Sequence, residues 1–217
     1  MRKIVIAVDG PAGAGKSTVA KIIANKLGIN YIDTGAMYRA ITYKALEKGI
    51  DINDNDRLIN LCKSTEIDFQ DENIYLDGKI VNEEIRQLQV SSNVSRVAQI
   101  KEVREIMVYL QRKMADRYSV IMDGRDIGSY VFPNADYKFF LTASVQERAN
   151  RRYMELKNKG YDVTIEDIIK DIETRDKIDS EREFAPLVKA KDAIEVNTSN
   201  KSIDEVVHEI LNCIKMG

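Results

Sequence analysis

A glycine-rich segment near the start of the chain carries the residues best suited to chemistry. Gly10, Gly15, Lys16 and Ser17 fit the eight-residue phosphate-loop pattern, and Gly13 lies inside it. In such a loop the backbone N–H groups surround a phosphate, the lysine ammonium reaches the outer phosphates and the serine hydroxyl holds a magnesium ion. The predicted phosphate-binding residues are Gly10, Pro11, Ala12, Gly13, Ala14, Gly15, Lys16, Ser17 and Thr18.

The residues on either side supply the strand and helix that this loop requires. The apolar run Lys3–Asp9 predicts a strand buried on both faces. Apolar positions recur at helical spacing after Ser17, and Gly28 is placed to end that helix. A glycine-rich turn without a ligand is the competing interpretation. It is disfavoured because both the motif and its context are complete.

Four more short apolar runs predict further strands, at Ile29–Asp33, Ser119–Asp123, Tyr137–Leu141 and Ala193–Val196. Helical segments separate them, so the chain is predicted to form a parallel sheet with helices on both faces. Ligands of such sheets bind at the carboxyl ends of the strands. The residues that follow each strand are therefore the candidates for a binding site.

Arginines and carboxylates gather at these strand ends. Arginine suits phosphate because its planar fork binds phosphate oxygens in pairs. Phosphoryl transfer needs positioning and positive charge, and an acceptor that is itself a phosphate needs no general base, which agrees with the single histidine, His208. The candidates are Asp33, Thr34, Tyr38, Arg39, Asp123, Arg125, Asp126, Arg148, Arg151, Arg152, Arg175, Asp179 and Arg182.

Each of these residues also has a structural interpretation. Arg148, Arg151 and Arg152 follow helical spacing and could form a solvated helix face, the usual place for charge. Asp33 and Asp123 could cap the helices that follow them.

The stretch Glu66–Val81 breaks the alternation of strands and helices. Its apolar residues alternate, and turn signals lie at Asp71–Asn73 and Asp77-Gly78, so it predicts a small antiparallel sheet of two or three strands. Helices are predicted around it and later in the chain at Asn53–Lys63, Asn82–Gln99, Lys101–Arg117, Val145–Asn158, Thr164–Ile178 and Ser202–Lys215.

The composition of the chain argues against several classes of protein. A chain of 217 residues suits one domain, and a net charge of −2 with interspersed signs gives no basic field for nucleic acid. No apolar run reaches membrane-spanning length, and the start does not resemble a signal peptide. Cys62 and Cys213 are isolated, which suits a reduced cytoplasmic compartment. Without an apolar seam, a monomer is expected.

Several motifs together resemble a known family. They are VDGPAGAGKST at Val8–Thr18, IDTGAMYRA at Ile32–Ala40, NEEIR at Asn82–Arg86, MDGRDIG at Met122–Gly128, VFPNADYKFFLTAS at Val131–Ser144, ERANRRYMEL at Glu147–Leu156 and TRDKIDSEREFAPL at Thr174–Leu187. The phosphate loop alone occurs in many ATPases and GTPases, but the combination is similar to the bacterial cytidylate kinases, of the nucleoside monophosphate kinase group. The resemblance covers nearly the whole chain.

The resemblance implies an α/β P-loop fold of three layers, with a five-stranded parallel sheet, an antiparallel insertion in an acceptor-binding arm, and a short helical lid. It implies a single kinase domain over residues 1–217, with its core at 1–33, 98–147 and 163–217, a CMP-binding arm at 34–97 and a lid at about 148–162. The implied reaction is transfer of the γ-phosphate of ATP, with Mg²⁺ as cofactor, to CMP or dCMP.

The resemblance also assigns residues. Lys16, Arg125, Arg151, Arg152 and Arg182 are implied as catalytic and Ser17 as the metal ligand. The CMP site is implied to comprise Thr34, Tyr38, Arg39, Ser95, Arg104, Arg125, Asp126, Arg175, Asp179 and Arg182. Of these, Ser95, Arg104 and Asp126 would read the cytosine edge, because a carboxylate accepts from the cytosine amine and repels the uracil carbonyl. Ile178 stands where some relatives carry arginine, so the preference between sugars is left open.

Two other functions remain as alternatives. A kinase for another acceptor, such as UMP, AMP or shikimate, is disfavoured by the antiparallel insertion and the pair Arg104 and Asp126. A GTP-dependent switch would need an Asn-Lys-x-Asp motif. Asn-Lys occurs at Asn25, Asn158 and Asn200, and none has the aspartate.

Overall fold

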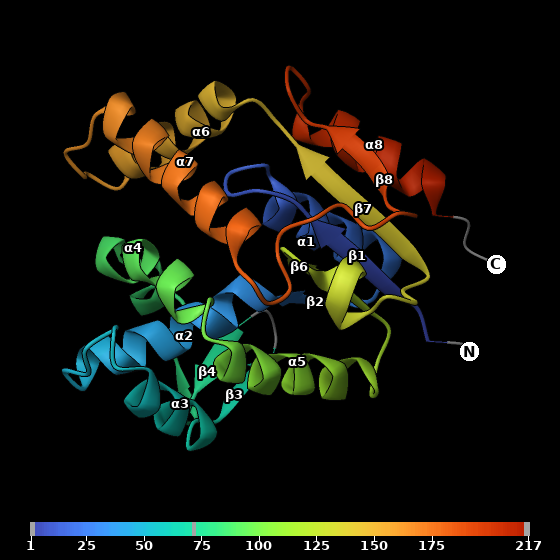
Figure 1. The fold of residues 1–217 in the computed structure, drawn as a ribbon. Coiled ribbons are helices and arrows are strands. Elements are labelled where there is room, and N and C mark those ends of the chain that lie inside the picture. Colours follow the sequence, from blue (N-terminus) through green and yellow to red (C-terminus); the bar gives the residue numbers. More distant parts are fainter. Residues whose placement is uncertain (1–2, 71–72, 215–217) are drawn as a thin grey trace. The chain divides into compact units, whose positions relative to one another are not determined.

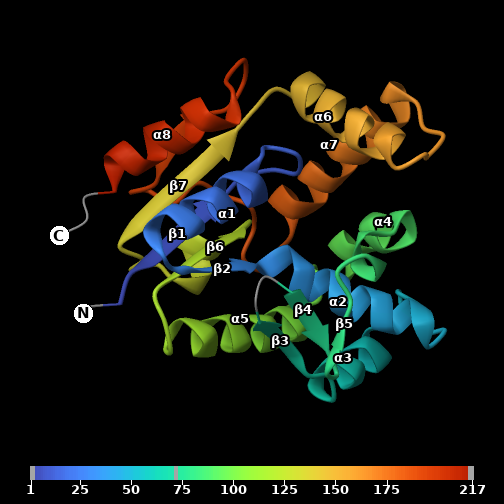
Figure 2. The ribbon, with the colours of Figure 1, turned by 180° about the vertical axis from the view of Figure 1, so that it is seen from behind.

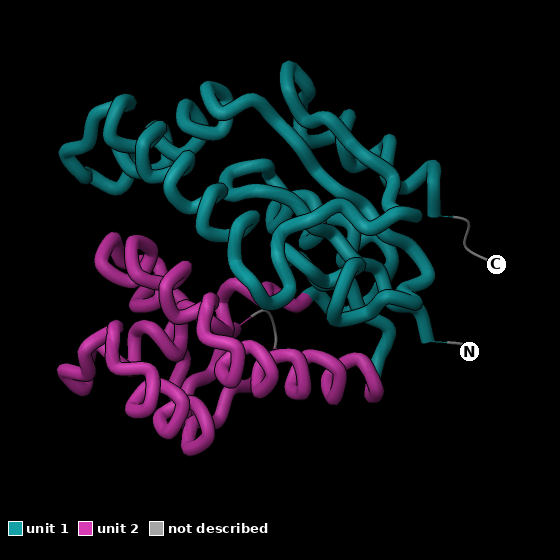
Figure 3. The backbone as a smooth tube through the Cα atoms, in the orientation of Figure 1, with its two compact units in different colours: residues 1–31, 118–217 teal, residues 32–117 magenta. Residues whose placement is uncertain are grey.

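The computed structural model describes residues 3–70 and 73–214. The chain forms two compact units, one of residues 1–31 and 118–217 and one of residues 32–117 (Figure 3). The division into core, arm and lid is a functional one and stays a prediction. The turn predicted at Asp71–Asn73 falls partly outside the described residues.

A five-stranded sheet carries the phosphate loop. Its order is β2-β6-β1-β7-β8, with β1 in the centre (Figure 1). The strands are β1 Val5–Asp9, β2 Asn30–Asp33, β6 Val120–Gly124, β7 Tyr137–Thr142 and β8 Ile194–Asn197. β1 pairs in parallel with β6 and β7, and β7 pairs in parallel with β8. The predicted parallel sheet, with β1 buried between its neighbours, is confirmed.

In the described part of the first unit, four α-helices accompany this sheet: α1 Lys16–Leu27, α6 Val145–Asn158, α7 Ile165–Glu181 and α8 Ile203–Cys213. α1 and α8 lie together over the sheet and share one apolar core with it, including Ile6, Phe139 and Ile210 (Figure 2). α6 and α7 pair through Leu156, Ile168 and Ile172. Helix packing thus covers the strands and leaves their carboxyl ends to the loops.

The ends of these helices follow local chemistry. Gly28 ends α1 in the left-handed conformation, with φ of 64°, as predicted. The Thr164 hydroxyl accepts from the N–H of Asp167 at the start of α7, and Ser202 and Glu205 form the capping box that starts α8. α7 continues beyond the predicted Ile178 to Glu181, which places Asp179 inside the helix.

The second unit contains a helical part and the predicted antiparallel sheet. Its elements are α2 Thr34–Glu47, α3 Asn55–Lys63, β3 Ile67–Gln70, β4 Asn73–Leu76, β5 Lys79–Ile80, the 3₁₀ turn η1 Glu84–Arg86, α4 Leu88–Val97 and α5 Lys101–Ala115. β4 pairs antiparallel with both β3 and β5. Asp77 and Gly78 both have positive φ, as a tight hairpin turn requires. A continuous helix over Asn82–Gln99 is wrong, because the backbone of Gln87 is extended and separates η1 from α4.

The remaining predictions from composition concern single residues. Cys62 is buried, and burial raises the pKa of its thiol to about 12, so it is a core residue without thiolate reactivity. Cys213 is partly buried beside the core, and His208 is exposed on α8. Among the described residues, no helix is both long and apolar enough to cross a membrane.

Candidate active site

The phosphate loop between β1 and α1 has the backbone that its glycines predict. Gly10, Gly13 and Gly15 all have positive φ, at 145°, 76° and 86°. A Cβ on Gly10 would lie 2.1 Å from the carbonyl oxygen of Leu141 in β7, so no larger residue fits there. α1 starts at Lys16 and no side chain caps it, which leaves a helix N-terminus directed to the loop. The loop therefore has the form of an anion cradle.

Lys16 lies at the centre of this cradle. It is buried, and its Nζ donates to the carbonyl oxygen of Pro11 at 2.7 Å. Burial, with Arg125 as the next cause, lowers the pKa of its ammonium to about 7. A bound polyphosphate would favour the charged form, so Lys16 is electrostatically matched to such a ligand.

Ser17 and Asp123 provide a place where a magnesium ion fits. The Ser17 hydroxyl donates to Oδ2 of Asp123 at 2.9 Å, and the Tyr31 hydroxyl donates to the other carboxylate oxygen at 2.7 Å. The described residues hold no group of three metal-ligating side chains. Mg²⁺ takes one or two protein oxygens and fills its other positions with phosphate oxygens and water, so a hydroxyl beside a carboxylate suits it. Asp123 does not cap a helix through these contacts.

Asp9, at the end of β1, is a residue that sequence reasoning missed. Its buried carboxylate accepts from the N–H of Ile127 at 2.8 Å and of Gly128 at 2.7 Å. These bonds fix the start of a π-helical turn, Ile127–Val131, directly after the predicted base-reading residue Asp126. An acidic residue immediately before a phosphate loop was the available signal.

The ionisation of Asp9 gives a testable dependence of stability on pH. Burial raises the pKa of this carboxyl from 3.8 to about 7, although the two backbone N–H groups oppose the shift. Between these values the folded protein keeps a proton that the unfolded chain has lost, so stability falls as pH rises from about 4 to about 7.

We expect Asp9→Asn to remove that part of the pH dependence. The free energy of unfolding of the wild type, relative to the variant, should fall by at most about 4 kcal/mol over this range. Urea unfolding at pH 4, 5, 6 and 7 measures it. A constant difference between the two proteins would contradict the raised pKa.

A network of opposite charges joins β6 to the end of α7. Arg125 Nε donates to Oδ2 of Asp179 at 2.8 Å, and Arg182 lies 3.9 Å from the other oxygen of Asp179 and 3.4 Å from Oδ1 of Asp126. Asp126, Asp179 and Arg182 are each at most 8% exposed. The structure thus brings together four of the predicted site residues from segments more than fifty residues apart in sequence.

The pKa values of Asp179 and Arg125 both favour the charged forms. Burial raises the pKa of Asp179, but Arg125 and Arg182 outweigh it and the net shift is downward. Burial likewise lowers the pKa of Arg125, and Asp179 reverses the shift. Arg175, one turn earlier on α7, has its pKa lowered by burial and by Arg125, and its partner Asp171 lies 3.8 Å away. Such a site is preorganised for an anion.

The three arginines of α6 have different surroundings. Arg148 is buried and donates to the carbonyl oxygen of Ala12 in the phosphate loop at 2.8 Å, so it is not a solvated residue. Arg151 donates to the carbonyl and hydroxyl oxygens of Thr198, which follows β8. Arg152 pairs with Glu155 on its own helix at 2.8 Å. Helical spacing alone did not distinguish these environments.

In the second unit, Asp33 and the start of α2 form one group. The Asp33 carboxylate accepts from the N–H of Ala36 at 2.8 Å and pairs with Arg39 at 2.7 Å. The capping interpretation of Asp33 is therefore confirmed. Burial raises its pKa, yet Arg39 and the backbone contact bring it below its usual value. Thr34 is buried in the first turn of the same helix.

A second group lies where α2, α4 and α5 meet. The Arg104 guanidinium is 5.5 Å from the centre of the Tyr38 ring and donates to the carbonyl oxygen of Ala98 at 3.1 Å. Arg104 is 1% exposed, and Ser95 on α4 is 6% exposed. A buried guanidinium within cation–π distance of an aromatic ring, and bonded to a carbonyl oxygen, has a restricted position from which to donate to a ligand.

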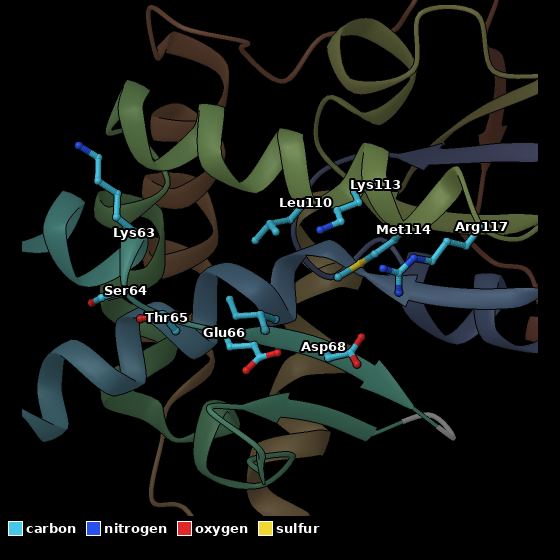
Figure 4. A pocket seen from close by; sticks show the side chains of 10 residues that line it. Lys63, Ser64, Thr65, Glu66, Asp68, Leu110, Lys113, Met114 and Arg117 are labelled. Carbon is cyan, nitrogen blue, oxygen red and sulfur yellow. The ribbon is translucent and has the colours of Figure 1, made fainter.

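A pocket of about 510 Å³ in the second unit is separate from these groups. It lies between α5 and the segment from the end of α3 into β3, with Leu110, Lys113, Met114 and Arg117 on the α5 side (Figure 4). None of the predicted site residues lines it. We therefore do not assign it to the candidate active site.

Comparison with known proteins agrees with the motifs. Residues 6–216 match the family model described as cytidylate kinase. The chain is 63% identical over 216 residues to the cytidylate kinase of Clostridioides difficile (strain 630), with 100% of both chains covered. It is 60% identical over 215 residues to the cytidylate kinase of Alkaliphilus oremlandii (strain OhILAs), with 99% of each covered.

Solved structures of lower identity agree on the fold. A shikimate kinase from Bacteroides thetaiotaomicron superposes with a TM-score of 0.51 at 12% identity, covering 98% of this chain and 99% of the other. An uncharacterised protein from Eubacterium ventriosum ATCC 27560 gives a TM-score of 0.55 at 14% identity, with 98% of each chain covered. With the family model spanning nearly every residue and relatives of such high identity, the chain belongs to the cytidylate kinase family.

Proposed function

We propose that this protein transfers the γ-phosphate of ATP to CMP or dCMP and releases ADP and CDP or dCDP. The observation that carries the proposal is an intact phosphate loop, with Lys16 and Ser17 in place, in a chain of the cytidylate kinase family. The substrates are small molecules. We also propose that the protein is a monomer, that it works in the cytoplasm, and that it binds neither nucleic acid nor a membrane.

The donor triphosphate binds to the phosphate loop. Backbone N–H groups of the loop surround its phosphates, and the Lys16 ammonium moves from the Pro11 carbonyl oxygen to the β- and γ-phosphate oxygens. Ser17 is the proposed Mg²⁺ ligand, with Asp123 beside it, directly or through water. The ion, when bound, neutralises charge on the donor phosphates.

The acceptor phosphate needs no general base. Its second pKa is about 6, so at neutral pH an anionic oxygen is available to attack. A bond forms between that oxygen and the γ-phosphorus, the bond from this phosphorus to the bridging oxygen breaks, and the electron pair stays on ADP. Arg125 and Arg182 hold the acceptor and transferring phosphates, and Arg151 and Arg152 approach from the lid.

The residues that the family resemblance assigns to CMP give the proposed specificity for the base. Asp126 accepts from the cytosine amine, and Ser95 and Arg104 hold the other polar atoms of the base. Thr34, Tyr38 and Arg39 complete this part of the CMP site, and Arg175 and Asp179 bind the sugar. A uracil carbonyl would face the Asp126 carboxylate, leave both without a donor, and be rejected.

A coupled assay of ADP formation tests the proposed function. Mg-ATP alone should be hydrolysed slowly, and CMP should raise the rate by at least about 10²-fold, because bound acceptor completes the site and water is excluded. The same rate of ADP formation with and without CMP would overturn the proposal.

A further inference from the structure

The carbonyl groups of the phosphate loop have partners built into the first unit. The Ala12 oxygen accepts from Nη1 of Arg148 at 2.8 Å, and the Ala14 oxygen accepts from the Thr198 hydroxyl at 3.2 Å. Arg148 is 4% exposed and Thr198 is 3% exposed, so both side chains are held within the protein. Arg148 lies in α6 and Thr198 directly follows β8. They are 136 and 184 residues along the chain from the carbonyl groups that they bind.

These two bonds determine where the next N–H groups point. The described peptide bonds include no cis bond, and in a trans peptide the C=O of one residue and the N–H of the next point in opposite directions. When Arg148 holds the Ala12 carbonyl, the Gly13 N–H is directed the other way. Thr198 has the same effect on the Gly15 N–H through the Ala14 carbonyl.

Arg148 is itself fixed by several contacts. Its Nη1 is 2.6 Å from Oδ2 of Asp176, and its Nε donates to the carbonyl oxygen of Ala143 at 3.1 Å. The other Asp176 oxygen accepts from the Ala12 N–H at 3.3 Å, so Arg148 and Asp176 bind both polar groups of Ala12. A Cβ on Gly13 would lie 3.0 Å from the Arg148 Cβ, so α6 packs directly on the loop.

Thr198 is fixed in a similar way. Arg151 donates to its hydroxyl oxygen at 3.0 Å and to its carbonyl oxygen at 2.7 Å. The hydroxyl also donates to the Thr142 carbonyl oxygen at 3.1 Å, which receives the Thr198 N–H at 2.7 Å as well. The single hydroxyl hydrogen is thus shared between the Thr142 and Ala14 carbonyls, and Ala14 is its contact in the phosphate loop.

We infer that Arg148 and Thr198 are positioning residues that turn the Gly13 and Gly15 N–H groups toward the donor phosphates. Each acts through one carbonyl of the loop and on one amide. The inference rests on the proposed function, since it takes the loop to be the site of the donor phosphates.

The sequence allows both amides to be observed alone. Of the 11 glycines, only Gly13 and Gly15 follow an alanine. Protein labelled with [1-¹³C]alanine and [¹⁵N]glycine therefore gives two signals in an HNCO spectrum. Each signal reports the ¹³C shift of one carbonyl, Ala12 or Ala14, and the shift of the amide that follows it.

Thr198→Val and Arg148→Lys should change different signals. Thr198→Val removes the hydroxyl at almost constant shape, so it should move the Ala14 carbonyl upfield and leave the Ala12 carbonyl unchanged. Arg148→Lys cannot make all the contacts of the guanidinium and should move the Ala12 carbonyl only. Thr198→Ser keeps the hydroxyl and should resemble the wild type. The inference is overturned if each substitution moves both carbonyl signals, or if neither substitution moves any carbonyl signal.

Binding of magnesium tripolyphosphate, which carries no base, measures the consequence. Loss of one oriented N–H should raise its dissociation constant about 3- to 10-fold in Thr198→Val, and Thr198→Ser should restore it. The KM for CMP should change less than about twofold, since a single carbonyl contact on the donor side does not touch the acceptor. Unchanged tripolyphosphate binding in Thr198→Val would contradict the inference. Wild-type signals that do not respond to tripolyphosphate would instead contradict the proposed function.

Discussion

Replacement of Lys16 by methionine is expected to lower the CMP-dependent rate of ATP cleavage by about 10³-fold or more. The ammonium is the buried cation of the phosphate loop, and it lies against the Pro11 carbonyl, within the loop that the triphosphate would occupy. Methionine has a similar length but no charge, so it cannot stabilise the charge that develops on the transferring group. Initial rates at saturating ATP and CMP measure the effect.

Stability separates this loss from misfolding. A buried ammonium with a pKa lowered to about 7 costs free energy in the folded protein, so Lys16→Met should unfold at the same or a higher temperature than the wild type. Lys26→Met is the matched control, because Lys26 is exposed in the last turn of the same helix. We expect the control to keep the full rate. A rate for Lys16→Met within about tenfold of the wild type would be incompatible with the proposed role of Lys16.

Asp126→Asn should lower kcat/KM for CMP by about 10²-fold and change the KM for ATP by less than about threefold. The asparagine side chain can place an N–H where the carboxylate only accepts, so the cytosine amine would meet a donor. For the same reason the preference for CMP over UMP should decrease. Steady-state kinetics with each acceptor measure this.

The ratio of CMP use to UMP use is the informative quantity here. Asp126 also lies 3.4 Å from Arg182, so a general disturbance of the charge network could lower all rates together. Asp162→Asn is the control, since the Asp162 side chain is fully exposed. Equal losses with CMP and UMP, or an equal weakening of ATP, would show that Asp126 does not read the base.

Much of the fold could be predicted because its signals are local. The strand-loop-helix unit at Lys3–Gly28 follows from apolar periodicity and from the glycines of the loop, and the capping residues Thr164 and Ser202 mark their helices. The start of α4 could not be predicted, since the extended backbone at Gln87 carries no Gly or Pro signal. α7 extends beyond its predicted end because tertiary ion pairs stabilise its last turn, between Asp179 and Arg125 and between Arg182 and Asp126.

The candidate site likewise has one part that the sequence predicts and another that it does not. Residues in the phosphate loop could be found from spacing, and the strand ends supplied Arg125 and Asp126. The partners of the loop, Arg148, Asp176 and Thr198, come from segments whose local patterns show only a charged helix and a strand end. Their contacts span more than a hundred residues of sequence, and such contacts depend on the folded topology.

The acceptor specificity of the wild-type protein tests the central claim most directly. ADP formation from Mg-ATP would be measured with CMP, dCMP, UMP, AMP and GMP supplied separately, and the phosphorylated product identified in each reaction. The proposed function predicts rapid turnover with CMP and dCMP, with CDP and dCDP as products, and little with the other three. Equal rates with all five acceptors, or ADP without a nucleoside diphosphate product from CMP, would contradict it.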